Sequence, residues 1–506
     1  MSVTKKALVL FPHQLFDAVH LPEVDTIYLV EEPLIFGTDD QYPVCMHVQK
    51  LILHRASMRR YYQEMLWPAG YEVKYIEDQD GLRTEHIIAR VAVDGHADIF
   101  VFDPVDYEIN RRLRIAQSQV DKAVRITILE TPNFLLDRLE AGEYFAGKHE
   151  HLFADFYKWQ RERFNILLTK NYKPIGGKWS FDNDNRHKLR KDIDLPDIDA
   201  YGDNEYVKEA RHYVQTRFGH LNGSDEDFIW PTNHAESAAW LDEFILERLD
   251  RFGTYQDAVE PDKPFMYHSV ISPMLNIGLL SPKQVIDAVI DAYEKRSLRL
   301  ESVEGFLRQV LGWREFVRGI YEHNGVAMRT GNYFENSRRL TDHWYRGDTG
   351  LVPVDDAIRK TKQFGYMHHI ERLMVVSNAM LLSDIHPDAV YQWFMEMSID
   401  AYDWVMVPNV YGMGQYADGG KMVTKPYVSG SNYIHKMSHY EKSGWSETWD
   451  GLYWSFLKRH RSKLKTNPRL GLALGSLDRM SPDKLRILEY RAGDFLASRT
   501  TRHDNK

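Results

Sequence analysis

The runs Ala7-Leu-Val-Leu-Phe11 and Thr26-Ile-Tyr-Leu-Val30 decide the fold of the first part of the chain. Both are short, apolar and rich in β-branched residues, as is typical of buried strands. Similar runs recur at 72–76, 99–102 and 125–129, and helical periodicity at 48–66 and 85–93 lies between them. Because strands that alternate with helices form right-handed crossovers, the sequence predicts an α/β domain with a doubly wound parallel sheet over residues 1–130. No Gly-rich dinucleotide or triphosphate loop follows any of these strands, so an ordinary nucleotide site is excluded.

The remainder of the chain has two different sequence patterns. Residues 131–230 contain loop markers such as Gly176-Gly177 and Pro196-Asp-Ile-Asp199, and they lack strand periodicity. Beyond residue 231 nearly every segment is helical, and prolines such as Pro273, Pro353 and Pro408 separate the segments. The sequence therefore predicts an interdomain connector at 131–230 and a large all-α domain at 231–506.

The composition excludes several classes of protein. The single cysteine, Cys45, rules out a disulfide framework and any metal or cluster site built on several thiolates. No apolar run reaches the roughly 18 residues of a transmembrane helix, and the first run is too short for a signal peptide, so we expect a cytoplasmic protein. The net charge of −9 excludes a uniformly basic nucleic-acid binder. It does not exclude one basic face, and basic residues are densest at 158–191 and 459–469.

Polar residues gather in three stretches of the helical half. Ser269, Ser272 and Asn276 surround a proline-marked helix start, an arrangement that suits a diphosphate, although each residue alone is also typical of a helix cap. The second stretch, 305–318, contains Trp313-Arg-Glu-Phe316. The third begins at His368-His369, continues through 400–413 and ends at 425–433.

The residues of these stretches and the order of the stretches closely resemble the sequences of the photolyase/cryptochrome family, and within it those of the bacterial (6-4) photolyases. The resemblance extends over essentially the whole chain and includes His54-Arg-Ala-Ser57-Met58, Pro132-Asn-Phe-Leu135 and the segment 174–186. It implies a light-driven DNA repair enzyme that contains FAD in its helical domain and acts on UV-damaged DNA as a monomer. No metal ion and no membrane take part in that reaction.

The resemblance also implies which residues surround the flavin. Those expected at the diphosphate and ribityl chain are Tyr255, His268, Ser269, Ser272 and Asn276. Those expected at the isoalloxazine are Gln309, Arg372, Asp400, Asp403 and Asn409, and Trp313 lies on the helix between the flavin and the DNA-facing pocket. A carboxylate suits the flavin N3–H, but the sequence leaves open whether Asp400 or Asp403 has this role.

His368 and His369 are the residues expected to carry the chemistry. Repair of a (6-4) photoproduct needs a proton as the electron arrives, and a histidine that titrates near neutrality suits that step. Adjacent helical residues point about 100° apart, so one ring can face the lesion while the other packs in the core. We expect His369 to be the donor and His368 its support. By resemblance, Met413, Tyr427 and Tyr433 line the lesion pocket.

Further roles follow from the same resemblance. Trp393 and Trp344 match the family's electron-transfer chain, although Phe394 stands where relatives can carry a tyrosine. Gln14, Leu15 and Glu31 match positions near an antenna chromophore, typically 6,7-dimethyl-8-ribityllumazine. Lys178 and Arg186 match a loop that lies near the lesion strand, so we expect them to contact phosphates.

The chain departs from its relatives at the iron–sulfur cluster. Those relatives place four cysteines in the C-terminal region, where this chain has none, so the cluster cannot be ligated. We expect Trp445, Trp449, Tyr453 and Trp454 to fill the volume. Two other readings stay open: a cryptochrome, which has the same flavin site but signals instead of repairing, and an enzyme for cyclobutane dimers. The retained histidine pair favours (6-4) repair over both.

Overall fold

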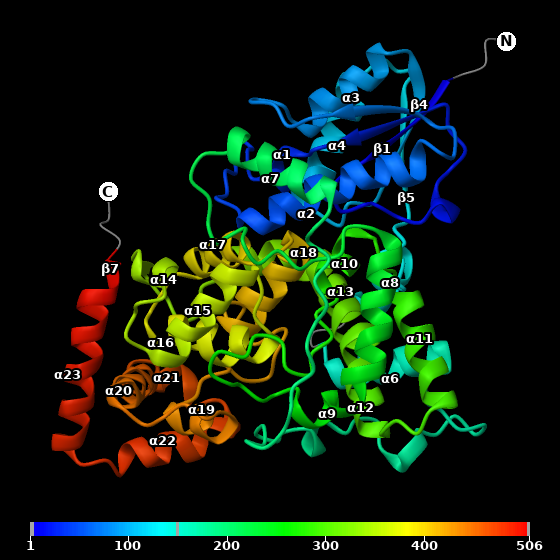
Figure 1. Ribbon diagram of the computed structural model, residues 1–506. Coiled ribbons are helices and arrows are strands. Elements are labelled where there is room, and N and C mark those ends of the chain that lie inside the picture. The colour runs from blue at the N-terminus through cyan, green and yellow to red at the C-terminus, as the bar shows by residue number, and fades with distance from the viewer. Residues whose placement is uncertain (1–4, 148–150, 503–506) are drawn as a thin grey trace.

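The computed structural model describes residues 5–147 and 151–502 (Figure 1). Its N-terminal part contains a five-stranded, entirely parallel sheet in the order β3-β2-β1-β4-β5. The strands are β1 (Lys5–Leu10), β2 (Thr26–Val30), β3 (Glu72–Ile76), β4 (His96–Phe102) and β5 (Arg125–Leu129). The strand order reverses at β1, which confirms the predicted doubly wound sheet. The carboxyl ends of its strands point toward the helical domain (Figure 1).

Helices cover both faces of this sheet. They are α1 (Pro33–Phe36), α2 (Val48–Tyr61), α3 (Thr84–Val93) and α4 (Tyr107–Gln119), with one π-helical turn, η2 (Tyr62–Leu66), and a 3-10 turn, η1 (Ala18–His20). Helix α2 is buried on nearly all sides because α7 (Glu205–Arg217) packs on its outer side (Figure 1). The N-terminal domain is therefore completed by a helix from the predicted connector.

The connector serves both domains. It contains α5 (Arg138–Phe145), α6 (Phe153–Phe164), α7 and the short turns η3 (Ile175–Gly177) and η4 (Asp182–Asp184). Helix α6 packs against η6 (Arg308–Arg314) of the helical domain, whereas α7 packs against α2. The two domains are thus joined by a segment that contributes a helix to each.

The C-terminal half is helical, as predicted. Its helices are α8 (His234–Glu243), α9 (Leu249–Tyr255), α10 (Ser272–Ile277), α11 (Pro282–Lys295), α12 (Leu300–Leu307), α13 (Glu315–Arg329), α14 (His343–Arg346), α15 (Val352–Phe364), α16 (Asn378–Leu382), α17 (Pro387–Met397), α18 (Asp403–Met406), α19 (Ser431–Met437), α20 (Gly444–Arg459), α21 (Arg461–Leu464), α22 (Gly471–Asp478) and α23 (Pro482–Arg499), with the 3-10 turn η9 (Pro468–Leu470). One exception is a small antiparallel ribbon of β6 (Arg338–Leu340) and β7 (Thr500–Arg502), which ties the C-terminus to the domain. No helix in the described ranges is long and apolar enough to cross a membrane.

Four further π-helical segments interrupt this domain: η5 (Phe244–Arg248), η6, η7 (Glu371–Ser377) and η8 (Val407–Gly414). A π-turn adds a residue to the helix and changes the direction in which the following side chains point, and such turns are frequent at functional sites. Three of the four contain residues that the sequence assigns to the flavin or the lesion pocket, namely Gln309 and Trp313 on η6, Arg372 on η7, and Asn409 and Met413 on η8.

Two of the four aromatic residues expected to replace the cluster are buried. Trp445 and Trp449 pack edge to face with 6.2 Å between ring centroids, and the Trp449 indole donates to the Ser429 carbonyl at 2.9 Å. Tyr453 and Trp454 are half-buried and pack against the same core. Helix α23 comes so close to α20 that a Cβ on Gly451 would lie 2.6 Å from the Leu488 carbonyl oxygen. That these four aromatic residues fill the volume of the cluster stays a prediction.

Candidate functional site

A buried ion pair lies at the centre of the predicted flavin region. Arg372, on η7, contacts Asp400 through two parallel hydrogen bonds of 2.8 and 3.1 Å. Ser272 Oγ donates to the same carboxylate at 2.5 Å, and Asn276 Nδ2 donates to the Asp400 backbone carbonyl at 2.9 Å. Segments far apart in the sequence are thus held together by one carboxylate, and the planar guanidinium fixes its orientation.

The Trp313-Arg-Glu-Phe316 block joins this centre to the connector. Glu315 accepts hydrogen bonds from the backbone N–H groups of Leu135 and Leu136, at 3.0 to 3.1 Å. Arg314 donates to Asn276 Oδ1 at 2.6 Å, and its guanidinium lies 4.9 Å from the ring centroids of Phe134 and Trp404. The block therefore positions Asn276, and with it the loop that contains Asp400.

Two further basic side chains, Arg314 and Lys50, lie near the Arg372–Asp400 pair. Burial lowers the pKa of Arg314 to about 10, although Glu315 lies close, and no carboxylate of a described residue forms an ion pair with it. Lys50, on α2, is almost fully buried and donates to the Ala401 carbonyl. Burial lowers its pKa from 10.5 to about 7, and Asp400 opposes the effect. Arg314 and Lys50 thus bind groups next to Asp400, namely Asn276 and the Ala401 carbonyl, without a carboxylate ion pair of their own, and their charges suit an anionic ligand.

Lys50 belongs to a cluster at the domain interface that sequence reasoning missed. Its ammonium lies 4.8 Å from the Tyr402 ring centroid, and the Tyr402 hydroxyl is 3.3 Å from His54 Nε2. His13, at the end of β1, lies on the other side of Tyr402, with 5.8 Å between ring centroids. Burial lowers the pKa of both histidines, so both rings are neutral. A lysine within a helix has no signal in a single sequence that distinguishes it from a surface residue.

We predict that Lys50→Met makes stability less dependent on pH. Because the pKa is lower in the folded than in the unfolded protein, the unfolded chain binds more protons between pH 7 and 10.5, and wild-type stability rises with pH there. The variant has no titrating group at this position. The free energy of unfolding of the variant minus that of wild type should therefore fall by about 3 kcal/mol between pH 7 and 9.5, as measured in denaturant titrations. Lys283→Met, at an exposed lysine, is the control, and curves that stay parallel would contradict the prediction.

The two adjacent histidines have different environments. His368 is buried and stacks on His268 with 4.5 Å between ring centroids, and its Nε2 lies 3.5 Å from Glu371 Oε2. Burial, followed by the neighbouring His268, holds the pKa of His368 well below its usual range. His369, in contrast, is exposed, and the charges of Arg372 and His268 act on its ring. The structure therefore directs His368 into the core and leaves His369 open.

The protonation state of His369 differs from the sequence expectation. Burial, followed by the charge of Arg372, lowers its pKa to about 4. The ring is therefore neutral at pH 7 in the free protein, and the expected titration near neutrality is wrong for this state. A neutral imidazole donates a hydrogen bond but is not an acid near pH 7, so the proposed proton transfer requires that the ring be protonated when an anionic ligand lies beside it.

A second group of predicted residues gathers around the connector loop. The charges of Asp257 and Arg186 act on the Tyr433 hydroxyl. The charges of Asp182 and Arg186 act on the Tyr427 hydroxyl. Burial raises the pKa of both tyrosines and, with Asp182, raises the pKa of Asp257 to about 6. Arg186 pairs with Asp182, and Lys178 pairs with Asp184 at 2.9 Å. Both cations are exposed but already have acidic partners in the free protein.

Several predicted cofactor residues contact protein groups instead of the Asp400 centre. Asp403 accepts from Tyr321 and Tyr391 at 2.5 Å and from Arg329, so both its oxygens are engaged elsewhere. Trp313 stacks on Phe153 with 3.9 Å between ring centroids. Three more residues have partners of their own: Tyr255 stacks on Tyr267, Asn409 donates to the Val405 carbonyl, and the Ser269 carbonyl accepts from Trp240. Gln309 lies 3.5 Å from Gln256, and Met413 is buried on η8.

The two predicted electron-transfer tryptophans are in contact. The Trp393 indole N–H donates to the Trp344 carbonyl at 2.9 Å, and the Trp344 indole donates to the Arg499 carbonyl at 2.9 Å. Both rings are fully buried. Phe394 packs edge to face on Trp393, with 5.0 Å between ring centroids, so an aromatic ring is retained where a tyrosine is replaced.

The predicted antenna residues lie at the carboxyl ends of the strands and are fully engaged. Gln14 accepts from the Phe11 N–H and donates to the Phe102 carbonyl, and Leu15 is part of the core. Glu31 accepts from Arg55, Tyr75, Tyr213 and the Asp78 N–H. These side chains stabilise the domain, and none offers a free hydrogen-bonding group to a chromophore.

Comparisons with known proteins agree with this architecture. A model of the "deoxyribodipyrimidine photo-lyase-related protein" family matches residues 8–230, and one of the "FAD binding domain of DNA photolyase" matches residues 306–449. These two matches define a photolyase-type α/β domain followed by a photolyase FAD-binding domain. The chain belongs to the photolyase/cryptochrome family, and its single cysteine excludes a cysteine-ligated iron–sulfur cluster.

The chain is similar to the (6-4) photolyase of Agrobacterium fabrum, with 34% identity over 469 residues, which cover 89% of this chain and 91% of that protein. A bacterial class III photolyase from Agrobacterium tumefaciens has the same fold, with a TM-score of 0.56 and 17% identity over 98% of both chains. A cryptochrome of Synechocystis sp. PCC6803 also has this fold, with a TM-score of 0.54 and 15% identity over 96% of this chain and 95% of that one. The fold alone therefore does not separate repair from signalling.

Proposed function

We propose that the protein repairs (6-4) photoproducts in DNA in a light-driven reaction that uses FAD. The observation that carries the proposal is the open His369 ring directly next to the Arg372–Asp400 pair. One side chain can donate a proton into an internal space, and the adjacent pair can hold a flavin at the edge of that space. The similarity to a (6-4) photolyase over most of the chain supports the same function.

The residues around Asp400 fit FAD. Asp400 rather than Asp403 is the proposed acceptor for the flavin N3–H, since the Asp403 oxygens already bind Tyr321, Tyr391 and Arg329. Arg314 and Lys50 have no carboxylate ion pair among the described residues, and their charge suits the diphosphate of FAD. Fully reduced FAD, when bound, supplies an electron on illumination.

The chain's own residues then position the lesion and supply the proton. A damaged dinucleotide is more easily unstacked than an intact one, which favours its entry into the internal space. Tyr427, Tyr433 and Met413 are the proposed walls for its bases. The anionic strand beside His369 raises the pKa of its ring, and the protonated ring donates a proton to the oxygen that returns between the two bases and becomes neutral again. His368, stacked on His268, holds the helix that carries His369 in place.

Three further assignments belong to this proposal. Lys178 and Arg186 contact DNA phosphates. These phosphates replace Asp184 as the partner of Lys178 and Asp182 as the partner of Arg186. Trp393 and Trp344 carry electrons through the helical domain. Gln14, Leu15 and Glu31 lie beneath a lumazine antenna at the carboxyl ends of the strands. They would contact the antenna by packing only, because the polar groups of Gln14 and Glu31 already bind protein groups.

The electron-transfer assignment predicts slow photoreduction in Trp393→Phe. Phenylalanine is far harder to oxidise than tryptophan, and the variant also loses the hydrogen bond to the Trp344 carbonyl. The measurement is the rate at which the flavin absorption bleaches under blue light with an external reductant. Trp454→Phe is the matched control, at a half-buried tryptophan that has no part in the proposed route. Equal bleaching rates in both variants and wild type would rule Trp393 out.

The function is tested with oligonucleotides that carry one (6-4) photoproduct or one cyclobutane dimer. The purified, flavin-loaded protein should restore the (6-4) strand under illumination, as followed by chromatography, and leave the cyclobutane dimer intact. Flavin binding without repair of either lesion would favour a cryptochrome instead. Repair of the cyclobutane dimer alone would contradict the role of His369.

A further inference from the structure

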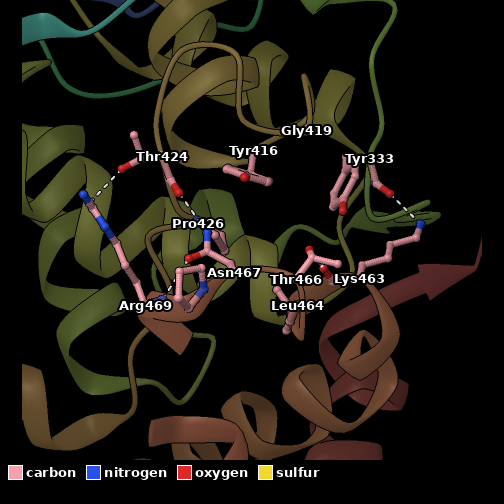
Figure 2. Close-up of a pocket in the computed structure, with 11 residues that line it drawn as sticks. Tyr333, Tyr416, Gly419, Thr424, Pro426, Lys463, Leu464, Thr466, Asn467 and Arg469 are labelled. Atoms are coloured by element: carbon pink, nitrogen blue, oxygen red, sulfur yellow. Dashed lines mark hydrogen bonds between the residues drawn. The ribbon is translucent and has the colours of Figure 1, made fainter. Parts of the chain in front are cut away.

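A cavity of about 350 Å³ is lined by residues such as Tyr333, Tyr416 and Arg469, and none of the residues that contact Asp400 lines it (Figure 2). It is formed by the loop after α13, the loop between η8 and α19, and the segment that joins α21 to η9. Pockets that hold small organic ligands begin at roughly this size. The family resemblance and the proposed repair reaction assign it no role.

Two tyrosines form the aromatic walls of the cavity. The ring centroids of Tyr333 and Tyr416 are 5.6 Å apart, and the rings are nearly perpendicular at 79°. The turn at Gly419 and Gly420 approaches both rings. Gly419 has φ +72°, and a Cβ there would lie 2.9 Å from Tyr333; Gly420 has φ +103°, and a Cβ there would lie 2.3 Å from the Tyr416 hydroxyl. The turn can come this close only because both residues lack side chains.

Cations stand on opposite sides of the cavity (Figure 2). Arg469 is exposed and donates to Thr424 Oγ1 at 2.7 Å, and no acidic side chain in the described ranges pairs with it. On the other side, Lys463 donates to the Tyr333 carbonyl at 2.6 Å and pairs with the exposed Glu335. Asn467, between them, donates to the Thr424 carbonyl at 2.8 Å and accepts from the Arg469 backbone N–H at 3.1 Å, so it holds the segment that carries Arg469. Aromatic walls and an unpaired guanidinium make a combination suited to a nucleotide.

The cavity is linked to the proposed lesion site. Thr424 and Pro426 line the cavity, and Tyr427 follows directly in the chain. The charge of Arg469 also acts on the Tyr427 hydroxyl, as does the charge of Arg186 from the connector loop. A DNA strand whose lesion contacts Tyr427 would therefore have its next nucleotides within reach of Arg469.

We infer that this cavity binds an unpaired nucleotide that flanks the lesion, with its base against Tyr333 and Tyr416 and its phosphate at Arg469. The inference rests on the proposed function, because it takes the lesion site to be at Tyr427. A flipped lesion leaves neighbouring bases without full stacking, and aromatic side chains recover part of the stacking energy. The cavity would hold the strand in register and would bind any of the four bases, since a ring face is common to all of them.

The test is an abasic scan combined with variants. Single-stranded oligonucleotides carry one abasic site at successive positions on either side of the lesion, and dissociation constants are measured in the dark. Wild type should lose at least about fivefold in affinity at one flanking position. Tyr333→Ala should bind the intact strand correspondingly more weakly and show no further loss at that position. Arg469→Glu, at an exposed side chain, should weaken binding even if Tyr333→Ala fails to fold.

The control is Lys465→Ala, which removes an exposed charge near the cavity that does not line it. It should weaken all strands equally and keep the full abasic penalty. Undamaged strands, which have no lesion to fix their register, separate this inference from the repair function: Tyr333→Ala and Arg469→Glu should weaken the binding of these strands too, even in a protein that repairs nothing. An abasic penalty of equal size in wild type and Tyr333→Ala, or wild-type affinity in Arg469→Glu, would overturn the inference.

Discussion

His369→Ala should lower the rate of (6-4) repair at least about 100-fold while the protein keeps its flavin. The ring is the only open donor in the histidine pair, since His368 is buried against His268 and Glu371. No other residue in the described ranges holds the His369 ring by a hydrogen bond, so its removal should cost little stability. The measurement is the repair rate under saturating light, normalised to bound FAD.

The matched control is His86→Ala, at an exposed histidine on α3 in the other domain. This variant should repair at the wild-type rate. His369→Asn is a stricter test, because asparagine keeps a hydrogen-bond donor but cannot give up a proton at these pH values. If His369→Asn repairs as fast as wild type, the ring positions the lesion and does not supply the proton.

Asp400→Ala should have the second large effect, on both stability and flavin binding. Removal of one partner leaves the guanidinium of Arg372 buried without its charge partner, which costs about 3–5 kcal/mol for a buried pair. The Ser272 hydroxyl also loses its acceptor. We expect a clear drop in the free energy of unfolding and, because the proposed acceptor for the flavin N3–H is lost, a purified protein with less than about a tenth of the wild-type FAD content.

The control for Asp400 is Asp403→Asn, three positions further along the same segment. Asp403 is held by Tyr321, Tyr391 and Arg329, so this variant should lose stability but keep its flavin. FAD content is read from the visible spectrum, and stability is read from chemical denaturation. Loss of flavin in Asp403→Asn together with retention in Asp400→Ala would reverse the assignment of the two carboxylates.

The architecture was predictable because its signals are local. The run Thr26–Val30 is a strand with the predicted bounds, and so are Glu72–Ile76 and Arg125–Leu129. Short apolar, β-branched runs with these bounds are recognised from the residues of the run itself. The predicted helix at 48–66 is also present, as α2 and the π-turn η2. The small ribbon of β6 and β7 was missed because it pairs segments some 160 residues apart, and no local pattern encodes such a contact.

The sequence indicates which residues belong to the site but not how those residues pair with one another. Motif resemblance selects Asp400 and Asp403 together, but it cannot tell which carboxylate meets Arg372, since that depends on the turn from the loop into α18. The histidine pair shows the same limit, because burial decides the pKa of each ring and burial is a property of the folded chain. Lys50 carries no motif at all, and only the docking of the α/β domain on the Asp400 loop reveals it.

Light-driven (6-4) repair is tested most directly by the amount of intact thymine that the flavin-loaded wild-type protein restores from a (6-4) photoproduct strand. This amount is compared between illuminated and dark samples. Repair should need light, continue for many turnovers per protein and disappear in His369→Ala. A protein that binds FAD and the damaged strand but restores no thymine under illumination would contradict the proposed function.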